Sequence, residues 1–226
     1  MLKISHVAWI VLGPPLAIYL MLFLSGDNKW LNGQLFLIIT TFSIYLICLY
    51  LKLYNPGLLI ERFNFKSDDQ DSNDKSFVSN IGKYLVLLFY VIMPIDHKYA
   101  IFPDFSYNVH VSSIIIIFLS YMMILFVFKQ NSFASPIIRN QKEREHSIIT
   151  SGLYAYVRHP MYTACVLIFI FTPLLLDSLY GAIFGIFISY SFCKRIEVEE
   201  NFLLNEFSSY SEYTKKVKFK IFPYIY

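Results

Sequence analysis

The chain has 226 residues, of which 56% are hydrophobic and only 15% are charged, with a net charge of +3. A soluble domain normally carries about 25% charged residues, so this composition excludes an ordinary water-soluble protein and indicates a membrane protein. No dense run of basic residues is present, and we therefore expect no nucleic-acid partner. The three cysteines lie in apolar stretches without a CxxC pair or a His cluster, so we expect neither a disulfide nor a bound metal.

Six apolar stretches are candidates for membrane-spanning helices, each of which needs about 20 residues. The predicted spans are 4–24, 35–54, 81–101, 109–128, 156–176 and 179–193. The third is the weakest, because Pro94, Asp96 and Lys98 interrupt it, and an interfacial hairpin is the alternative there. Only Asp177 and Ser178 separate the last two spans, so these should form an antiparallel helical hairpin. The sequence thus predicts an all-α integral membrane protein with about six transmembrane helices.

The distribution of basic residues predicts how these helices are oriented. With six spans, all of the 19 Lys and Arg residues except Lys29 and Lys98 fall on one side of the membrane. Cytoplasmic loops carry the excess of basic residues. We therefore expect a multi-pass protein with its N- and C-termini in the cytoplasm. A strongly polar loop near 61–80 lies on the same side, and we assign it no chemistry.

Two short motifs carry groups that recognise ligands. Arg158-His159-Pro160-Met161-Tyr162 stands where the fifth span begins, and Arg195 with Glu199 and Glu200 follows the sixth. Each motif alone also suits an ordinary membrane surface, with a snorkelling arginine, an interfacial tyrosine and a local Arg–Glu pair. The predicted hairpin, however, brings the start of the fifth span beside the end of the sixth. We therefore expect both motifs to line one cytoplasmic cleft.

These motifs, preceded by Ser151-Gly152-Leu153-Tyr154, together resemble the isoprenylcysteine carboxyl methyltransferase family. The resemblance runs from about Asn131 to the C-terminus and includes the tail residues Phe207, Tyr210, Tyr213 and Val217. The first 130 residues resemble the family only as generic membrane helices. The resemblance accordingly divides the chain into N-terminal transmembrane helices, 1–130, and a catalytic membrane methyltransferase region, 131–226.

The resemblance implies that S-adenosylmethionine binds in a cytoplasmic cofactor pocket between these helices. The residues that would contact this cofactor are His146, Ser147, Ile148, Ile149, Tyr154, His159, Pro160, Met161, Tyr162 and Glu199. Arg195 would be the catalytic residue that faces the methyl acceptor. Its guanidinium can orient a carboxylate through two hydrogen bonds.

The acceptor itself stays open at this stage. We expect a lipophilic or small molecule, and carboxyl O-methylation of a prenylcysteine-like substrate gives Arg195 the clearest role. A phospholipid N-methyltransferase is the nearest alternative, and methylation of a thiol is also open. An NADPH-dependent membrane lipid reductase and a non-enzymatic transporter are more distant alternatives. Besides the acceptor, the expected partners are membrane lipids.

Overall fold

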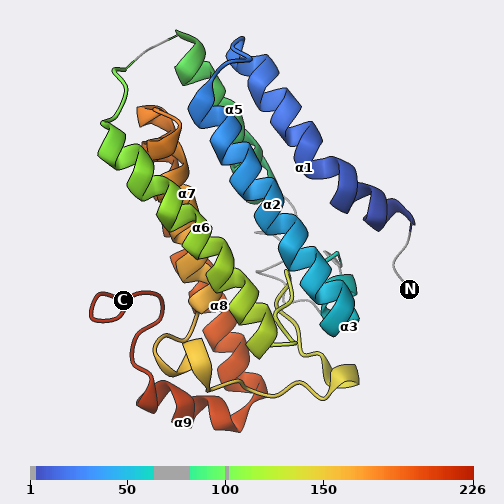
Figure 1. The fold of residues 1–226 in the computed structure, drawn as a ribbon. Helices are drawn as coiled ribbons and strands as arrows, with labels where there is room; N and C mark the ends of the chain where they lie inside the picture. Colours follow the sequence, from blue (N-terminus) through green and yellow to red (C-terminus); the bar gives the residue numbers. More distant parts are fainter. Residues whose placement is uncertain (1–3, 64–81, 100–101) are drawn as a thin grey trace.

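The computed structural model describes residues 4–63, 82–99 and 102–226, and it is a bundle of helices (Figure 1). The described residues form these helices and 3-10 turns: α1 Ile4–Ser25, α2 Leu31–Tyr54, α3 Pro56–Glu61, α5 Gly82–Tyr99, α6 Tyr107–Gln130, η2 Lys142–Arg144, η3 Gly152–Ala155, α7 Pro160–Leu175, α8 Leu179–Glu206 and α9 Ser208–Lys216. Within these ranges there is no strand, which confirms the prediction of an all-α fold. Most of the polar loop near 61–80 and the ends of the predicted third span lie outside the described residues.

The long helices lie side by side and share one apolar core. α1 packs on α2 and α5, α6 packs on α2 and α7, and α8 packs on α5 and α7. In the part of the chain that is described, α2 and α6 are long and apolar enough to cross a membrane. α7 and the segment Ile10–Ser25 are apolar but shorter. The number of six spans therefore stays a prediction.

The two helices that carry the motifs, α7 and α8, differ in length from the predicted spans. α7 begins at Pro160 and not at residue 156, because proline favours the first helical position while its ring disfavours helical geometry in the residue before it. His159 accordingly has φ −127° and ψ 62°. α8 continues well past Cys193, to Glu206, so Arg195, Glu199 and Glu200 extend from the apolar bundle on a continuous helix.

α7 and α8 approach closely because α8 carries two glycines that face its neighbours. A Cβ atom added at Gly185 would clash with the carbonyl oxygen of Phe169 in α7, and one at Gly181 would lie 2.9 Å from Met93 in α5. Such small-residue spacing permits close helix packing in lipid. The three residues between α7 and α8 bring the first turn of α7 and the charged end of α8 to the same end of the bundle (Figure 1).

The opposite end of the bundle is fastened by the Asp177 side chain in the α7–α8 turn. Its carboxylate accepts hydrogen bonds from Asn32 in α2, at 3.0 Å, and from the backbone amide of Phe105, at 2.7 Å. It also lies 2.7 Å from the ring nitrogen Nε2 of His110 in α6. Asp177 is 8% exposed and has φ 55°, a left-handed geometry that Asp tolerates better than most residues. The turn is thereby joined to two other helices.

Candidate functional site

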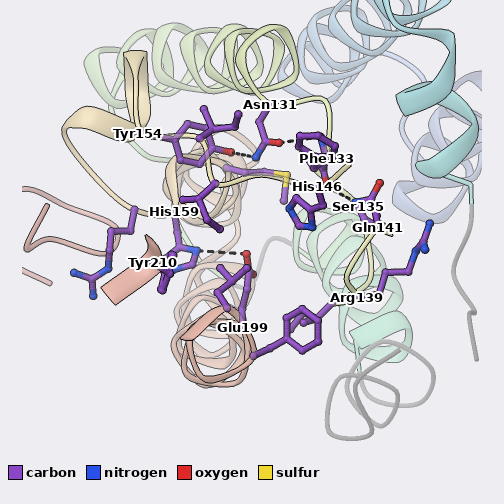
Figure 2. A pocket seen from close by; sticks show the side chains of 18 of the residues that line it. Asn131, Phe133, Ser135, Arg139, Gln141, His146, Tyr154, His159, Glu199 and Tyr210 are labelled. Carbon is purple, nitrogen blue, oxygen red and sulfur yellow. Dashed lines mark hydrogen bonds and ion pairs between the residues drawn. The ribbon is translucent and has the colours of Figure 1, made fainter. Parts of the chain in front are cut away.

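All the residues proposed to contact the donor or the acceptor line a single pocket at the α9 end of the bundle, whereas Glu200 lies outside its lining (Figure 2). The pocket encloses about 850 Å³, its open mouth included. Its walls come from the 131–149 segment, from η3, from the first turn of α7, from the charged end of α8 and from α9. The predicted residues in the lining are His146, Ser147, Ile148, Ile149, Tyr154, His159, Pro160, Met161, Tyr162, Arg195 and Glu199.

His159 lies between two consecutive carboxylates of α8. Its Nε2 atom is 3.2 Å from Glu200, and its Nδ1 atom is 3.7 Å from Glu199. The hydroxyl of Tyr162, one helical turn from His159, donates a hydrogen bond of 2.7 Å to Glu199. Two segments about 40 residues apart in the sequence therefore meet at the pocket wall, as Figure 2 shows for His159 and Glu199.

Glu200 differs from Glu199 because its charge is already matched by cations. Arg158 donates two hydrogen bonds to its two oxygens, at 2.6 and 3.2 Å, and the Lys220 ammonium lies 3.6 Å away. Burial acts to raise the pKa of this carboxyl, but the hydrogen bonds and charges of His159 and Arg158 outweigh burial and lower the pKa to about 2. Glu200 is therefore ionised at every physiological pH, and the nearby cations balance its negative charge. Glu199 receives no comparable cation among its described contacts.

The segment before η3 is held over the pocket by polar contacts that the sequence analysis missed. Arg139 donates two hydrogen bonds of 3.1 Å to Glu61, at the end of α3, and both residues are 8% exposed. Glu61 thus has a structural partner, although we assigned no chemistry to the loop that it begins. Asn131 donates a hydrogen bond of 2.9 Å to the hydroxyl of Tyr154, and the buried Gln141 amide donates one of 2.7 Å to the carbonyl of Phe133.

The His146 ring is held between two aromatic rings at the pocket wall. The centroid of its ring is 4.7 Å from that of Phe133 and 4.9 Å from that of Phe207. Burial, together with the nearby charges of Arg144 and Arg139, lowers the pKa of His146 to about 4. His146 is therefore neutral near pH 7. Its buried Nδ1 atom has no hydrogen-bond partner among the described residues.

The tail residues singled out in the sequence pack beneath the pocket. Tyr210, Tyr213 and Val217 are each at most 8% exposed and form a small apolar cluster with Tyr154 and Ile148 packed against it. The Tyr213 hydroxyl donates a hydrogen bond of 2.7 Å to the Tyr154 carbonyl. Burial, together with the nearby carboxylates, raises the pKa of Tyr210, so its hydroxyl stays protonated and donates to Glu200 at 3.3 Å. The tail is thus part of the pocket wall.

Arg195, the predicted acceptor-facing residue, also lies at the pocket wall. Its Nη2 atom donates a hydrogen bond of 2.5 Å to the carbonyl of Pro136, and its guanidinium carbon lies 6.0 Å from the centre of the Tyr162 ring. The arginine therefore connects α8 to the 131–149 segment. Its position leaves it beside Tyr162 and one helical turn from Glu199.

Comparison with known proteins identifies the group to which this arrangement is similar. A model of the isoprenylcysteine carboxyl methyltransferase family matches residues 112–205. The protein-S-isoprenylcysteine O-methyltransferase of Saccharomyces cerevisiae is 28% identical over 219 residues, which cover 92% of this chain and 85% of that protein. The enzyme of the same name from Schizosaccharomyces pombe is 35% identical over 85 residues, 37% of this chain and 36% of that protein.

A solved structure supports the same assignment at the level of the fold. The eukaryotic intramembrane Ras methyltransferase, an isoprenylcysteine carboxyl methyltransferase, superimposes with a TM-score of 0.54 at 19% identity and covers 100% of this chain and 88% of that one. The similarity extends beyond the region from Asn131 onward that the motifs indicated. The first helices therefore belong to the shared fold. The chain is thus similar to the isoprenylcysteine carboxyl methyltransferase family, and it is a membrane methyltransferase.

Proposed function

We propose that this chain transfers a methyl group from S-adenosylmethionine to the carboxylate of a lipophilic, prenylcysteine-like acceptor at the cytoplasmic face of a membrane. The observation that carries the proposal is that all eleven residues predicted for donor and acceptor line one pocket. The names of the relatives add that proteins of this family act on isoprenylcysteine. Neither the family nor these relatives favour a phospholipid N-methyltransferase or a lipid reductase.

The groups in the pocket fit the charges of the proposed donor. S-adenosylmethionine carries a sulfonium, an ammonium, a carboxylate and a flat aromatic base. Among the described contacts, Glu200 pairs with the Arg158 guanidinium, whereas Glu199 faces His159 at 3.7 Å, so Glu199 suits a positively charged group of the donor. The Nδ1 atom of neutral His146, which has no partner among the described residues, suits a polar hydrogen, and the tyrosine and phenylalanine rings suit a cation or a base. Buried charges need such partners.

The acceptor side of the pocket is assigned to Arg195. A guanidinium can bind both oxygens of a carboxylate, which fixes the direction in which one oxygen points. The carbonyl of Pro136 and the ring of Tyr162 hold this guanidinium at the pocket wall. An amine acceptor, which is neutral or positive, would gain nothing from the arginine.

The reaction requires little of the protein beyond alignment. The donor supplies an electrophilic methyl group, and a carboxylate acceptor with an ordinary pKa near 4 is already ionised at neutral pH, so no general base is needed. The role of Arg195 is to orient the acceptor oxygen, and the role of Glu199, His159 and Tyr162 is to hold the donor in line with it. The aromatic and aliphatic walls exclude water from the reacting groups.

The proposal includes the membrane topology expected from the sequence: six spans, cytoplasmic termini, and a division into residues 1–130 and 131–226. In Figure 1 the pocket end, with α3 and α9, lies opposite the α7–α8 turn. This arrangement is consistent with a pocket on the basic, cytoplasmic side. Cysteine-accessibility mapping of Tyr107→Cys and Glu212→Cys in sealed vesicles should label the two residues from opposite sides.

The proposed activity is tested with purified protein in lipid vesicles and a donor labelled on its methyl group. We expect calorimetric binding of S-adenosylmethionine but not of NADPH, and transfer of the label to an S-farnesylcysteine derivative. A methyl ester releases methanol in mild base, whereas a methylated amine or thiol does not, so base treatment identifies the acceptor atom. Binding of NADPH alone, or base-stable label, would contradict the proposal.

A further inference from the structure

The last eight residues, 219–226, form a loop that we call the terminal hook. Its backbone is joined to the first motif: the amides of Arg158 and His159 donate to the carbonyls of Phe219 and Lys220 at 2.9 and 2.8 Å. The Thr163 hydroxyl donates to the carbonyl of Ile221 at 2.7 Å. The hook is therefore fixed beside the first turn of α7, at the level where the apolar bundle ends, and Figure 1 shows it beside α8.

One face of the hook is packed and the other is not. Ile221 is 3% exposed and packs with Tyr162 and Ile196, against which Cys193 and Phe222 also pack. By contrast, Tyr224 is 91% exposed and Ile225 is 82% exposed. A tyrosine and an isoleucine held this far out by a fixed backbone expose an apolar surface that water does not favour.

The exposed face of α8 indicates what covers this surface. Ile183, Phe187 and Tyr190 are each more than half exposed and follow one another at helical spacing, as expected of a stripe that faces lipid. The stripe ends at Lys194, next to the residues on which Ile221 and Phe222 pack. The boundary between hydrocarbon and headgroups therefore falls at the height of the hook.

The charges around the hook favour an anionic surface. Lys215, Lys216 and Lys218 are exposed immediately before it, and Lys220 lies over the Tyr226 ring. Fewer carboxylates are exposed in this part of the described chain: Glu206 at the end of α8, Glu212 in α9, and Glu197, which is already paired with Lys194 at 3.3 Å. Lysines beside exposed aromatic and aliphatic side chains are the chemistry that binds anionic lipid at a bilayer interface.

We propose that the terminal hook is a lipid-binding surface, which places Tyr224 and Ile225 among the headgroups of the surrounding bilayer while Lys215, Lys216 and Lys218 bind anionic lipid. Through its hydrogen bonds to Arg158 and His159, the hook links that lipid contact to the pocket wall. The proposal concerns a surface outside the pocket and holds independently of which acceptor is methylated.

The position of the hook can be measured with a tryptophan probe. Tyr224→Trp protein is reconstituted in vesicles that contain dibrominated phosphatidylcholine, and the signal of the native tryptophans is subtracted using the unsubstituted protein. Tyr190→Trp, on the lipid-facing stripe, is the positive control, and Glu212→Trp, on the exposed face of α9, is the negative control. We expect the probe at 224 to be quenched like the one at 190. Quenching as weak as that at 212 would overturn the proposal.

Preference for anionic lipid is tested in mixed vesicles in which either the phosphatidylserine or the phosphatidylcholine carries the bromine. Each lysine near an anionic surface should enrich that lipid by about fivefold, less after screening by salt. Lys215→Gln, Lys216→Gln and Lys218→Gln together should abolish the enrichment at 224. Equal quenching of the probe at 224 by both lipids, in the protein that keeps its three lysines, would overturn the proposed preference for anionic lipid. Because this fluorescence does not depend on methyl transfer, a negative result would leave the proposed function standing.

Discussion

The Glu199→Gln substitution removes the charge from the pocket carboxylate and keeps its shape. Tyr162 can still donate its 2.7 Å hydrogen bond to the remaining oxygen, and His159 stays beside Glu200 at 3.2 Å. Burial and packing of α8 are therefore unchanged. The substitution isolates the interaction between the carboxylate and a positively charged group of the donor.

The size of the effect follows from the surroundings of the carboxylate. The Glu199 side chain is 27% exposed, so a hydrogen bond to a charged partner there contributes about 1.5–3 kcal/mol. At about 1.4 kcal/mol per factor of ten, the dissociation constant of S-adenosylmethionine should rise by about 10- to 150-fold. Glu199→Ala and His159→Ala, which also remove the contacts of the side chain, should abolish measurable binding.

Isothermal titration calorimetry of the purified protein measures this change. Glu197→Gln is the matched control, because Glu197 lies two residues away on the same helix but is paired with Lys194 outside the pocket, and exposed pairs contribute about 0–1 kcal/mol. We expect the control to bind the donor like the unsubstituted protein. Normal donor binding by the folded Glu199→Gln and His159→Ala variants would show that the donor does not bind where we place it.

Three further predictions test the acceptor, the packing and the pH dependence. Arg195→Ala should leave donor binding within about twofold but lower kcat/KM by at least about 100-fold, as expected for the loss of a charged, orienting contact; unchanged methylation of a prenylcysteine acceptor would refute the role of Arg195. Gly185→Ala should destabilise the protein in detergent by about 1–3 kcal/mol through overpacking against Phe169. Gly57→Ala is the control, because its added Cβ meets nothing closer than 3.9 Å and should not destabilise the protein. Equal melting temperatures for the two variants would contradict the packing described above. Because the pKa of His146 is lowered to about 4, the unfolded chain binds a proton at this ring between about pH 6.5 and 4 that the folded chain does not, so the stability of the protein should fall as the pH falls through that window. Thermal melts at several pH values should show that the stability of His146→Phe changes with pH less steeply, by up to one proton. Identical pH slopes for the two proteins would rule out a buried neutral imidazole.

The parts of the site that could be predicted from the sequence are the residues of short, local motifs. Arg158-His159-Pro160-Met161-Tyr162 identifies the start of a helix through its proline, and Arg195, Glu199 and Glu200 share one helical stretch. The short α7–α8 connection then suffices to place both motifs at the same end of the bundle. Helix type and approximate position were predictable because apolar length is a strong signal.

Other features could not be predicted because they depend on contacts between distant residues. Arg139 and Glu61 are 78 positions apart, and neither lies in a periodic pattern that would indicate its partner. The apolar criterion ended the last span at residue 193, although the charged residues that follow in α8 favour helix as well as many apolar ones do. The burial of His146 depends on the packing of Phe133 and Phe207 around its ring, which only the folded chain reveals.

The Asp177 turn has a mechanical consequence for the pocket at the other end of the same two helices. The three-residue connection keeps α7 and α8 from sliding along each other, and because its carboxylate is joined to Asn32, Phe105 and His110, the turn cannot shift along α2 and α6 without breaking several hydrogen bonds at once. Any widening between them must instead be a rotation about the clamped turn, in which displacement grows with distance along the helix. The largest movement would then occur between His159 and Glu199, where molecules must enter and leave.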